Sequence, residues 1–270
     1  MPDGHADIGN LLRGREQLEP LLADKVERLR DTVTGAGFSR AVIGLSGGVD
    51  SALSLAIAAE ALGSENITAI TLPSRHTDQV HVDDARACAE AAGLPEENFL
   101  TASIEPILDG IVTARPTVPD APMRFGNASA RARMIMIYDL GQERGGLVLG
   151  TENRSEYYLG YFTRFGDAAS DVEPIWDLYK TEVKVAAELM GQPESVLVKH
   201  PTAGLWGGQT DEDELGFTYR DADLAIVCLE ELKLDVDAAA ERSGVEREVV
   251  ARVKARVDSV AWKHRVPYVL

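Results

Sequence analysis

Six consecutive residues, Ser46-Gly-Gly-Val-Asp-Ser51, place two glycines, two hydroxyls and a carboxylate in one short segment. The apolar run before them, residues 41–45, is typical of a strand buried on both faces, and residues 52–62 after them are mostly strong helix formers. A turn between a strand and a helix exposes free backbone N–H groups at the positive end of the helix dipole. The glycines let this backbone approach an anion closely, and the serines add hydroxyl donors. The segment therefore predicts a loop that binds phosphate.

The carboxylate of Asp50 distinguishes this loop from the common phosphate-binding motifs. A Walker A loop has four residues between its glycines and a lysine before its serine or threonine, and neither feature is present here; the chain also has no G-x-G-x-x-G. A carboxylate beside phosphates repels them unless a divalent cation stands between, so Asp50 predicts Mg²⁺. The alternative is a glycine-rich connection with an incidental pair of serines. The strand and helix on either side favour the phosphate loop.

The composition is that of a folded and strongly acidic protein. Of the 270 residues, 45% are hydrophobic and 26% are charged, and the net charge is −17. This charge argues against general binding of nucleic acid, which needs a basic surface. An anionic nucleotide must therefore be met by a few local basic residues and a metal ion. The acidic balance favours solubility and would also suit a salt-rich cytoplasm.

No membrane segment or secretory signal is expected. No apolar run approaches membrane-spanning length, and the N-terminus lacks the basic and then apolar order of a signal peptide. The two cysteines, Cys88 and Cys228, fall in predicted helices without the spacing of metal ligands. They predict a reducing, cytoplasmic location and no disulfide framework.

Strand and helix patterns alternate along the first 150 residues. Strands are predicted at 41–45, 66–72, 98–101 and 145–150. Helices are predicted at 52–62, 80–92, about 104–112, 128–138 with Asn127 as a cap, 176–190, 193–198 and from 221 onward. A proline-rich connection without regular structure spans 115–122. The alternation predicts an α/β fold with a doubly wound, mainly parallel sheet flanked by helices.

The chain, 1–270, is predicted to be a single domain. Its first part, 1–37, carries leucines and valines near helical spacing among charges. This helical lead-in packs on its own domain or helps to form a dimer interface. Residues 38–220 form the nucleotide-binding core, and 221–270 form C-terminal helices and a short tail.

The phosphate loop resembles that of the ATP pyrophosphatases, which have the adenine nucleotide alpha-hydrolase-like fold and cleave ATP to AMP and pyrophosphate. Two later segments are similar to those of one branch of this group, the NAD synthetase family: Leu149-Gly-Thr-Glu-Asn-Arg-Ser-Glu156 and Gly160-Tyr-Phe-Thr-Arg-Phe-Gly-Asp167. The segment from His200 to Gly216, with Pro-Thr-Ala-Gly-Leu and Gln-Thr-Asp-Glu-Asp-Glu-Leu-Gly, is the most specific match. The resemblance runs from about residue 20 to residue 267.

The resemblance implies an ATP site with one metal ion. Its predicted ATP contacts are Gly44, Leu45, Ser46, Gly47, Gly48, Val49, Asp50, Ser51, Thr151, Lys180 and Thr202. Asp50 and Lys180 are the implied catalytic residues, and Asp50 and Glu156 are the implied Mg²⁺ ligands. Two carboxylates with phosphate oxygens are a normal magnesium set, and a compact lysine cation suits charge that develops at the α-phosphate. For Glu156 the alternative is an exposed acid at a helix start, favoured by the dipole.

One further ATP contact, Arg75, is predicted only from its position after the second strand. The resemblance also implies a site for deamido-NAD, with contacts from Asn127, Arg131, Arg164, Asp171, Lys263 and His264. At two places the chain departs from the family. Arg164 stands where the family has lysine, and Lys263-His264-Arg265 replaces the order His-Lys-Arg. Arginine and lysine are not equivalent at a tight anion site, which leaves the roles of Arg164 and of the Lys263–His264 pair open.

The implied reaction is the ATP-dependent amidation of deamido-NAD to NAD through an adenylate, the final step of NAD biosynthesis. The substrate supplies its own nucleophile, so the protein contributes positioning and electrostatics. The chain has no room for a glutamine-using amidase domain beside this core, so free ammonia, or ammonia from a separate subunit, is the expected nitrogen donor. A homodimer that binds neither nucleic acid nor membrane is expected.

Two other functions stay open at this point. A tRNA-thiolating ATP pyrophosphatase shares the loop but needs cysteine pairs or a basic RNA surface, which the charge of −17 disfavours. A sensor module on the same fold would bind ATP without releasing pyrophosphate. Turnover distinguishes the sensor from both enzymes.

Overall fold

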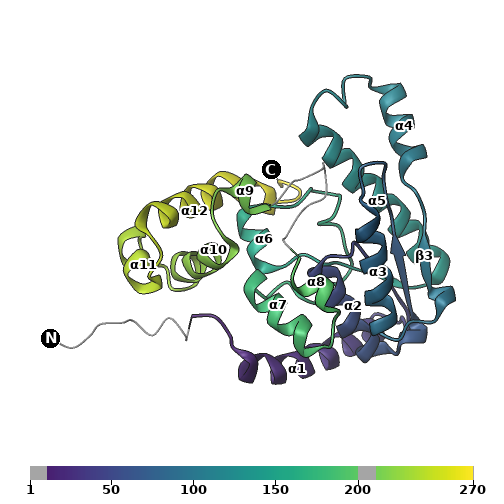
Figure 1. Ribbon diagram of the computed structural model, residues 1–270, viewed down its shortest axis with the longest axis horizontal. Coiled ribbons are helices and arrows are strands. Elements are labelled where there is room, and N and C mark those ends of the chain that lie inside the picture. Colours follow the sequence, from purple (N-terminus) through teal and green to yellow (C-terminus); the bar gives the residue numbers. More distant parts are fainter. Residues whose placement is uncertain (1–10, 200–210, 270) are drawn as a thin grey trace.

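A four-stranded parallel sheet forms the centre of the computed structural model, which describes residues 11–199 and 211–269 (Figure 1). Its spatial order is β3-β2-β1-β4, with β1 (Ala41–Gly44), β2 (Ile67–Thr71), β3 (Phe99–Thr101) and β4 (Leu147–Leu149). In the parallel register, Ala41 of β1 lies level with Ile67 on one side and Leu147 on the other. Ligands of such sheets bind beyond the carboxyl ends of the strands, where the segment 46–51 follows β1. The predicted α/β fold with a parallel sheet is confirmed.

Helices cover both faces of the sheet because side chains of adjacent strand residues point to opposite faces. Ile43 and Ala69 lie in a core shared with α1 (Arg15–Gly35), α2 (Val49–Leu62), α3 (Gln79–Ala91), α7 (Lys180–Leu189) and α8 (Glu194–Leu197). Their strand neighbours Val42 and Ile70 pack instead against α4 (Glu105–Ala114) and α5 (Pro122–Arg144). The strand β1, which has no polar side chain, and the strand β2, whose polar residues are two buried threonines, are therefore covered on both sides.

The C-terminal helices form a third apolar cluster. They are α9 (Asp211–Leu215), α10 (Tyr219–Ile226), a π-helical turn (Val227–Glu231), α11 (Val236–Ser243), α12 (Arg247–Val260) and a 3₁₀ turn (Ala261–His264). Figure 1 shows α10, α11 and α12 grouped on the left, with α6 (Arg154–Leu159) and α7 between them and the sheet. Leu159 and Tyr179, at the end of α6 and just before α7, are buried in this cluster. The helix α6 and the start of α7 thus join the C-terminal helices to the α/β core.

The helical lead-in packs on its own chain. The buried residues of α1 include Leu18, Leu22, Val26, Leu29 and Val33, which belong to the same core as α2 and α7. The apolar face of α1 is thus buried within the chain. It is not available to form the dimer interface that was the alternative role for this segment.

Two helix boundaries and one whole helix differ clearly from the sequence expectation. The helix α5 begins at Pro122, so Asn127 lies inside it and does not cap it. Proline suits the first position of a helix, where its missing N–H has no intrahelical partner to lose. The helix α7 begins at Lys180 and not at residue 176, and α6 is a six-residue helix that hydrophobic periodicity does not predict.

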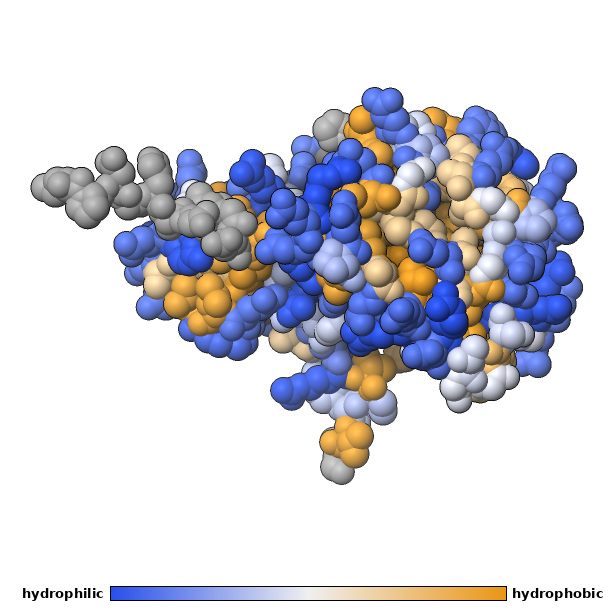
Figure 2. Space-filling model, turned by 90° about the horizontal axis from the view of Figure 1, so that it is seen from below, coloured by the Kyte–Doolittle hydropathy of each residue, from blue (hydrophilic) through white to orange (hydrophobic). Residues whose placement is uncertain are grey.

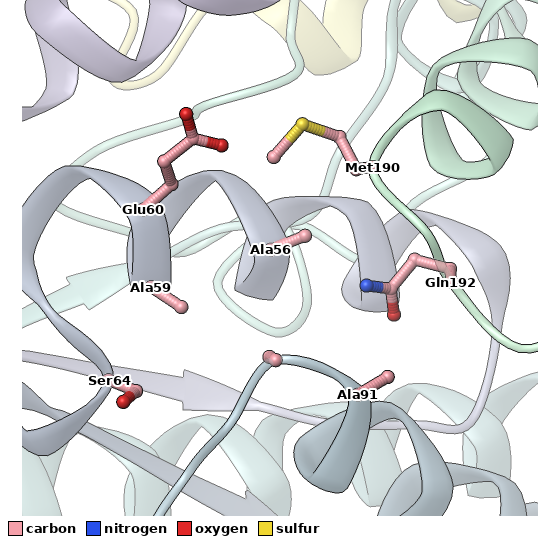
Figure 3. Close-up of a pocket in the computed structure, with 8 residues that line it drawn as sticks. Ala56, Ala59, Glu60, Ser64, Ala91, Met190 and Gln192 are labelled. Atoms are coloured by element: carbon pink, nitrogen blue, oxygen red, sulfur yellow. The ribbon is translucent and has the colours of Figure 1, made fainter.

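The surface view of Figure 2 shows mainly hydrophilic residues, with apolar residues in smaller groups. A cavity of about 270 Å³ lies between α2, the end of α3 and the α7–α8 connection, lined by residues that include Ala56, Glu60 and Gln192 (Figure 3). Ala56 is roughly 9 Å along α2 from Asp50 at the helix start, which separates this cavity from the phosphate loop. Over the described ranges, the structure contains no helix with the length and apolarity needed to cross a membrane.

Candidate active site

The loop 46–51 is held in shape by its own serines. The backbone N–H of Ser46 donates to Ser51 Oγ over 3.2 Å, and the N–H of Gly48 donates to Ser46 Oγ over 3.2 Å. Ser51 Oγ in turn donates to the carbonyl of Gly48 over 3.0 Å. Gly48 is the N-cap of α2, so the helix starts directly after the glycines. The loop therefore presents the first turn of α2, with its dipole, at the carboxyl end of β1.

Gly47 is required by its conformation and by its neighbour. Its φ is +75°, and a Cβ at this position would lie 2.2 Å from the backbone carbonyl oxygen of His81. Of the other residues predicted to contact ATP here, Leu45 and Val49 are buried apolar residues of the core, so only their backbone can serve a ligand. Gly44 packs against the side chain of Ile137 on α5.

Three charged side chains that lie far apart in the sequence meet beside this loop. Lys180 Nζ donates to Asp50 Oδ2 over 2.6 Å and to Glu156 Oε1 over 2.9 Å. Asp50 is in the first turn of α2, Glu156 in the first turn of α6, and Lys180 is the first residue of α7. Lys180 is buried, with 4% of its surface exposed. The structure thus brings together both predicted catalytic residues and both predicted metal ligands.

A fourth residue, Asn153, links these helices and was not among the predicted site residues. Its Nδ2 donates to Asp50 Oδ1 over 2.7 Å, and its Oδ1 accepts the N–H of Glu156 over 3.0 Å. Glu156 Oε2 accepts the N–H of Asn153 in return, which completes a capping box. The sequence signal was the Asn-x-x-Glu spacing of 153–156, which is typical of a helix start. Glu156 therefore does stand at a helix start, but the alternative of an exposed acid is wrong, because its side chain is only 16% exposed and faces Lys180.

The electrostatics of the site follow from burial. Burial raises the pKa of Glu156, and the nearby Asp50 adds to this increase while Lys180 opposes it. For Lys180, burial lowers the pKa, but the two carboxylates outweigh burial and its pKa lies above the ordinary value. Two carboxylates that share one lysine leave an excess of negative charge and two hard oxygen donors side by side. This donor set fits Mg²⁺, which is bound by one or two carboxylates together with substrate phosphates.

The six predicted deamido-NAD residues gather around the segment 157–171, which begins within α6 and continues beyond its end. From α5, Asn127 Oδ1 accepts the hydroxyl of Thr163 over 2.9 Å, and Arg131 donates to the carbonyl of Arg164 over 3.2 Å. Asp171 Oδ2 accepts the N–H of Val148 in β4 over 2.8 Å. Contacts to substrate for these residues stay predictions.

The departures from the family pattern also lie in this segment or contact it. Lys263 Nζ donates to the carbonyls of Gly160 and Phe162 over 2.6 and 2.7 Å. His264 stacks on the ring of Tyr157 at 4.0 Å between ring centroids, and its Nε2 lies 2.7 Å from the Tyr157 carbonyl. The guanidinium of Arg164 lies over the ring of Trp262 at 5.2 Å. The shifted Lys263–His264 pair therefore ties the C-terminal turn to the segment 157–171.

The remaining predicted ATP contacts are Arg75, Thr151 and Thr202. Arg75 pairs with two acids of α4, since its Nε donates to Glu105 over 2.6 Å and its Nη2 to Asp109 over 2.7 Å. Thr151 is partly buried and follows Gly150 at the carboxyl end of β4. Thr202 lies outside the described residues.

Two further acids, Glu152 and Glu173, lie next to the site and were not identified from the sequence. Glu173 accepts the N–H of Glu152 over 3.1 Å and the hydroxyl of Ser170 over 2.6 Å, and a Cβ on Gly150 would lie 1.9 Å from its Oε1. Glu152 Oε1 is buried without a hydrogen-bond partner among the described residues. Burial, with the charges of Glu173 and Glu156, raises the pKa of Glu152 to about 9.

The substitution Glu152→Gln is expected to raise the Tm of the free protein at pH 8 and to leave it nearly unchanged at pH 4.5. The folded protein holds a proton on Glu152 up to a pKa of about 9, while the unfolded chain loses it near 4.5. Between these values the folded state binds more protons, so stability falls as pH rises, and glutamine removes that dependence. Thermal melts across this pH range measure the difference. A constant difference at all pH values would contradict the assigned pKa.

Comparison of the sequence with protein families gives a match to the family described as NAD synthase, over residues 21–267. An NH(3)-dependent NAD(+) synthetase from Trichlorobacter lovleyi is 42% identical over 241 residues, which cover 89% of this chain and 86% of that protein. A protein of the same description from Thermococcus kodakarensis is 40% identical over 253 residues, which cover 94% and 96% of the two chains.

Solved structures give the same result for the fold. The structure of an NMN synthetase from Francisella tularensis is similar with a TM-score of 0.81 and 30% identity, covering 94% of this chain and 98% of that one. The NH3-dependent NAD synthetase from Campylobacter jejuni, solved with a nitrate ion, is similar with a TM-score of 0.77 and 27% identity, covering 94% and 99%.

Proposed function

Because this chain belongs to the NAD synthase family, we propose that it uses ATP to amidate deamido-NAD with ammonia, releasing NAD, AMP and pyrophosphate. Members of the family are ligases that catalyse the final step of NAD biosynthesis. The observation that carries the proposal is the meeting of Asp50, Glu156 and Lys180 beside a glycine loop at a helix start. This arrangement supports chemistry on a polyphosphate.

The loop and Lys180 supply positive potential for the phosphates. The first turn of α2 presents N–H groups and the helix dipole, and the glycines allow a close approach. With its raised pKa, Lys180 stays an ammonium ion at neutral pH. The nicotinate carboxylate attacks the α-phosphorus of ATP, pyrophosphate leaves toward the loop, and ammonia then displaces AMP from the adenylate with loss of a proton. Lys180 stabilises the charge that develops on the phosphate oxygens in the first step.

The metal ion is part of this proposal, with Asp50 and Glu156 as its protein ligands. When bound, Mg²⁺ neutralises phosphate oxygens and polarises the α-phosphate. Asp50 is oriented for this role by Asn153, which holds its second oxygen. Glu156 is oriented by its capping box.

Ammonia is the proposed nitrogen donor because the chain offers no thiol for glutamine hydrolysis. Both cysteines, Cys88 and Cys228, are fully buried in helical segments, and burial raises the pKa of the Cys88 thiol to about 12. A catalytic thiol needs access and a lowered pKa. The same features, with the net charge of −17, disfavour a tRNA-thiolating role.

The test measures pyrophosphate and NAD with ATP, Mg²⁺, ammonium and deamido-NAD, leaving out one component at a time. Pyrophosphate release should require deamido-NAD, and NAD should form only with ammonium. Both products should be lost in Asp50→Ala. A folded protein that binds ATP without turnover would overturn the proposal and favour the sensor module.

A second candidate substrate is suggested by the likeness to the Francisella tularensis NMN synthetase. Deamido-NMN carries the same nicotinate carboxylate as deamido-NAD but lacks the adenylyl half. A comparison of kcat/KM for the two substrates under identical conditions distinguishes them. We propose deamido-NAD because the sequence relatives of about 40% identity are described as NAD synthetases.

We also propose that the 270 residues act as one cytoplasmic domain that forms a homodimer. With the apolar face of α1 buried, α5 is the better interface, because its Met123 and Ile135 are each 53% exposed. Two unpaired cysteines agree with a reducing compartment. Sedimentation of the wild-type protein and Ile135→Glu tests the interface, and a wild-type monomer at micromolar concentration would contradict it.

A further inference from the structure

One buried carboxylate outside the site connects the two helices that carry Glu156 and Lys180. Asp223, in α10, has 0% of its surface exposed. Its Oδ1 accepts the hydroxyl of Ser155 over 2.5 Å, and its Oδ2 accepts both the N–H and the hydroxyl of Thr181 over 3.0 and 2.7 Å. Ser155 directly precedes Glu156 in the sequence, and Thr181 directly follows Lys180.

Ser155 links Asp223 to the backbone of Lys180 by two hydrogen bonds. Its Oγ donates to Asp223 and at the same time accepts the N–H of Lys180 over 2.8 Å. Asp223 and Ser155 together therefore bind the first two N–H groups of α7, those of Lys180 and Thr181. A helix start leaves such N–H groups without intrahelical partners, and an N-cap side chain usually accepts one of them. The N-cap of α7 is Tyr179, whose side chain makes no capping hydrogen bond, so the acceptors come from α6 and α10.

The helix α10 also contacts Lys180 directly, through a residue one turn before Asp223. The ring of Tyr219 lies 5.2 Å from Lys180 Nζ. Residues four apart share one helix face, so α10 presents Tyr219 to the side chain of Lys180 and Asp223 to Ser155 and Thr181, which lie beside it. Burial raises the pKa of Asp223 to about 7, while its bonds to Ser155 and Thr181 favour the charged form. All its bonds have donors on the partner side, as a carboxylate requires.

We infer that Asp223 is a positioning residue that fixes Lys180 against Glu156, so that the C-terminal helices set the geometry of the active site. This role rests on the proposed function of the site. A displacement of about 1 Å in a reacting group can lower a rate by about 100-fold. The hydrogen bonds of Asp223 and Ser155 join the starts of α6 and α7, from which Glu156 and Lys180 project. No sequence pattern assigns this role, because Asp223 falls in an ordinary amphipathic helix.

The test substitutes Asp223→Asn, which keeps the size but places an amide donor against a hydroxyl or N–H donor. The kcat for NAD formation should fall about tenfold or more, while the KM for deamido-NAD stays within about twofold. Ser155→Ala should act in the same direction, and the double variant should lose less than the product of the two single losses. Ser155→Ala also serves if Asp223→Asn does not fold.

Hydrogen exchange gives a readout that does not depend on turnover. In Asp223→Asn the amides at the start of α7 should exchange faster, while those of α12 keep the wild-type rate. The matched control is Asp235→Asn, because Asp235 caps α11 in the same C-terminal cluster by accepting the N–H of Ala238 over 2.9 Å. This control should keep the wild-type kcat.

Three results would overturn the inference. The first is unchanged exchange at the start of α7, and the second is faster exchange there with an unchanged kcat. An equal loss of kcat in Asp235→Asn would also refute it, since the effect would then reflect general loosening. If the wild-type protein made no NAD, the proposed function would be wrong. The hydrogen-exchange measurement would still decide whether Asp223 and Ser155 hold the start of α7.

Discussion

The substitution Lys180→Met is expected to lower kcat for pyrophosphate release by about 100-fold or more. Methionine has nearly the length of lysine and suits a side chain that is 4% exposed, so the change removes the charge without opening a large cavity. Asp50 and Glu156 would then face each other without the cation that lies within 2.9 Å of both. An uncompensated buried charge is strongly destabilising, so the Tm of the free variant should also fall.

Added Mg²⁺ separates the two consequences of this substitution. If the carboxylates form a cation site, Mg²⁺ with ATP should raise the Tm of Lys180→Met more than that of the wild type, without restoring kcat. The matched control is Lys254→Met, which removes an exposed lysine that donates to Asp258 on α12 over 2.5 Å. The control should keep both kcat and Tm. A near wild-type kcat in Lys180→Met would remove this lysine from catalysis.

The sequence predicts the parts of the fold that local patterns determine. The run 41–45 has no polar side chain, and the run 66–72 is apolar at four of its seven positions. A strand covered on both faces explains such runs between helices. The helix α6 escaped prediction because six residues are too few for periodicity, and short helices depend on capping and packing. The start of α5 was misplaced because Asn127 is a good cap by type, while Pro122 had already begun the helix.

The residues of the candidate site also differ in whether a local sequence pattern reveals them. The loop 46–51 is contiguous, so its residue types reveal its chemistry. Glu156 and Lys180, which lie 106 and 130 residues after Asp50, were predicted only through the family resemblance. Asn153 left a local signal, its capping-box spacing with Glu156. Asp223 and Glu173 left none, because an aspartate in a helix or a glutamate in a loop becomes informative only when its partners are known. These partners, Ser155, Thr181 and Ser170, are ordinary residues in sequence.

The substitution Gly47→Ala is expected to raise the KM for ATP by about 10- to 100-fold, which corresponds to the 1–3 kcal/mol that a strained backbone residue costs. Two independent constraints act on this residue. Its φ of +75° disfavours any side chain, and the new Cβ would lie 2.2 Å from the carbonyl oxygen of His81, a backbone atom that cannot rotate away. The loop must therefore move away from α3, and its N–H groups move with it.

The control for this prediction is Gly37→Ala, which has the same kind of strain without the clash. Gly37 has a φ of +85°, and beyond its two chain neighbours no residue has an atom within 4 Å of a Cβ built on it. It should lose stability while its KM for ATP stays at the wild-type value, because it lies before β1 and outside the loop. If both variants raised KM equally, the effect would come from general destabilisation. A rise confined to Gly47→Ala would mean that ATP binding depends on the close packing of this loop against α3.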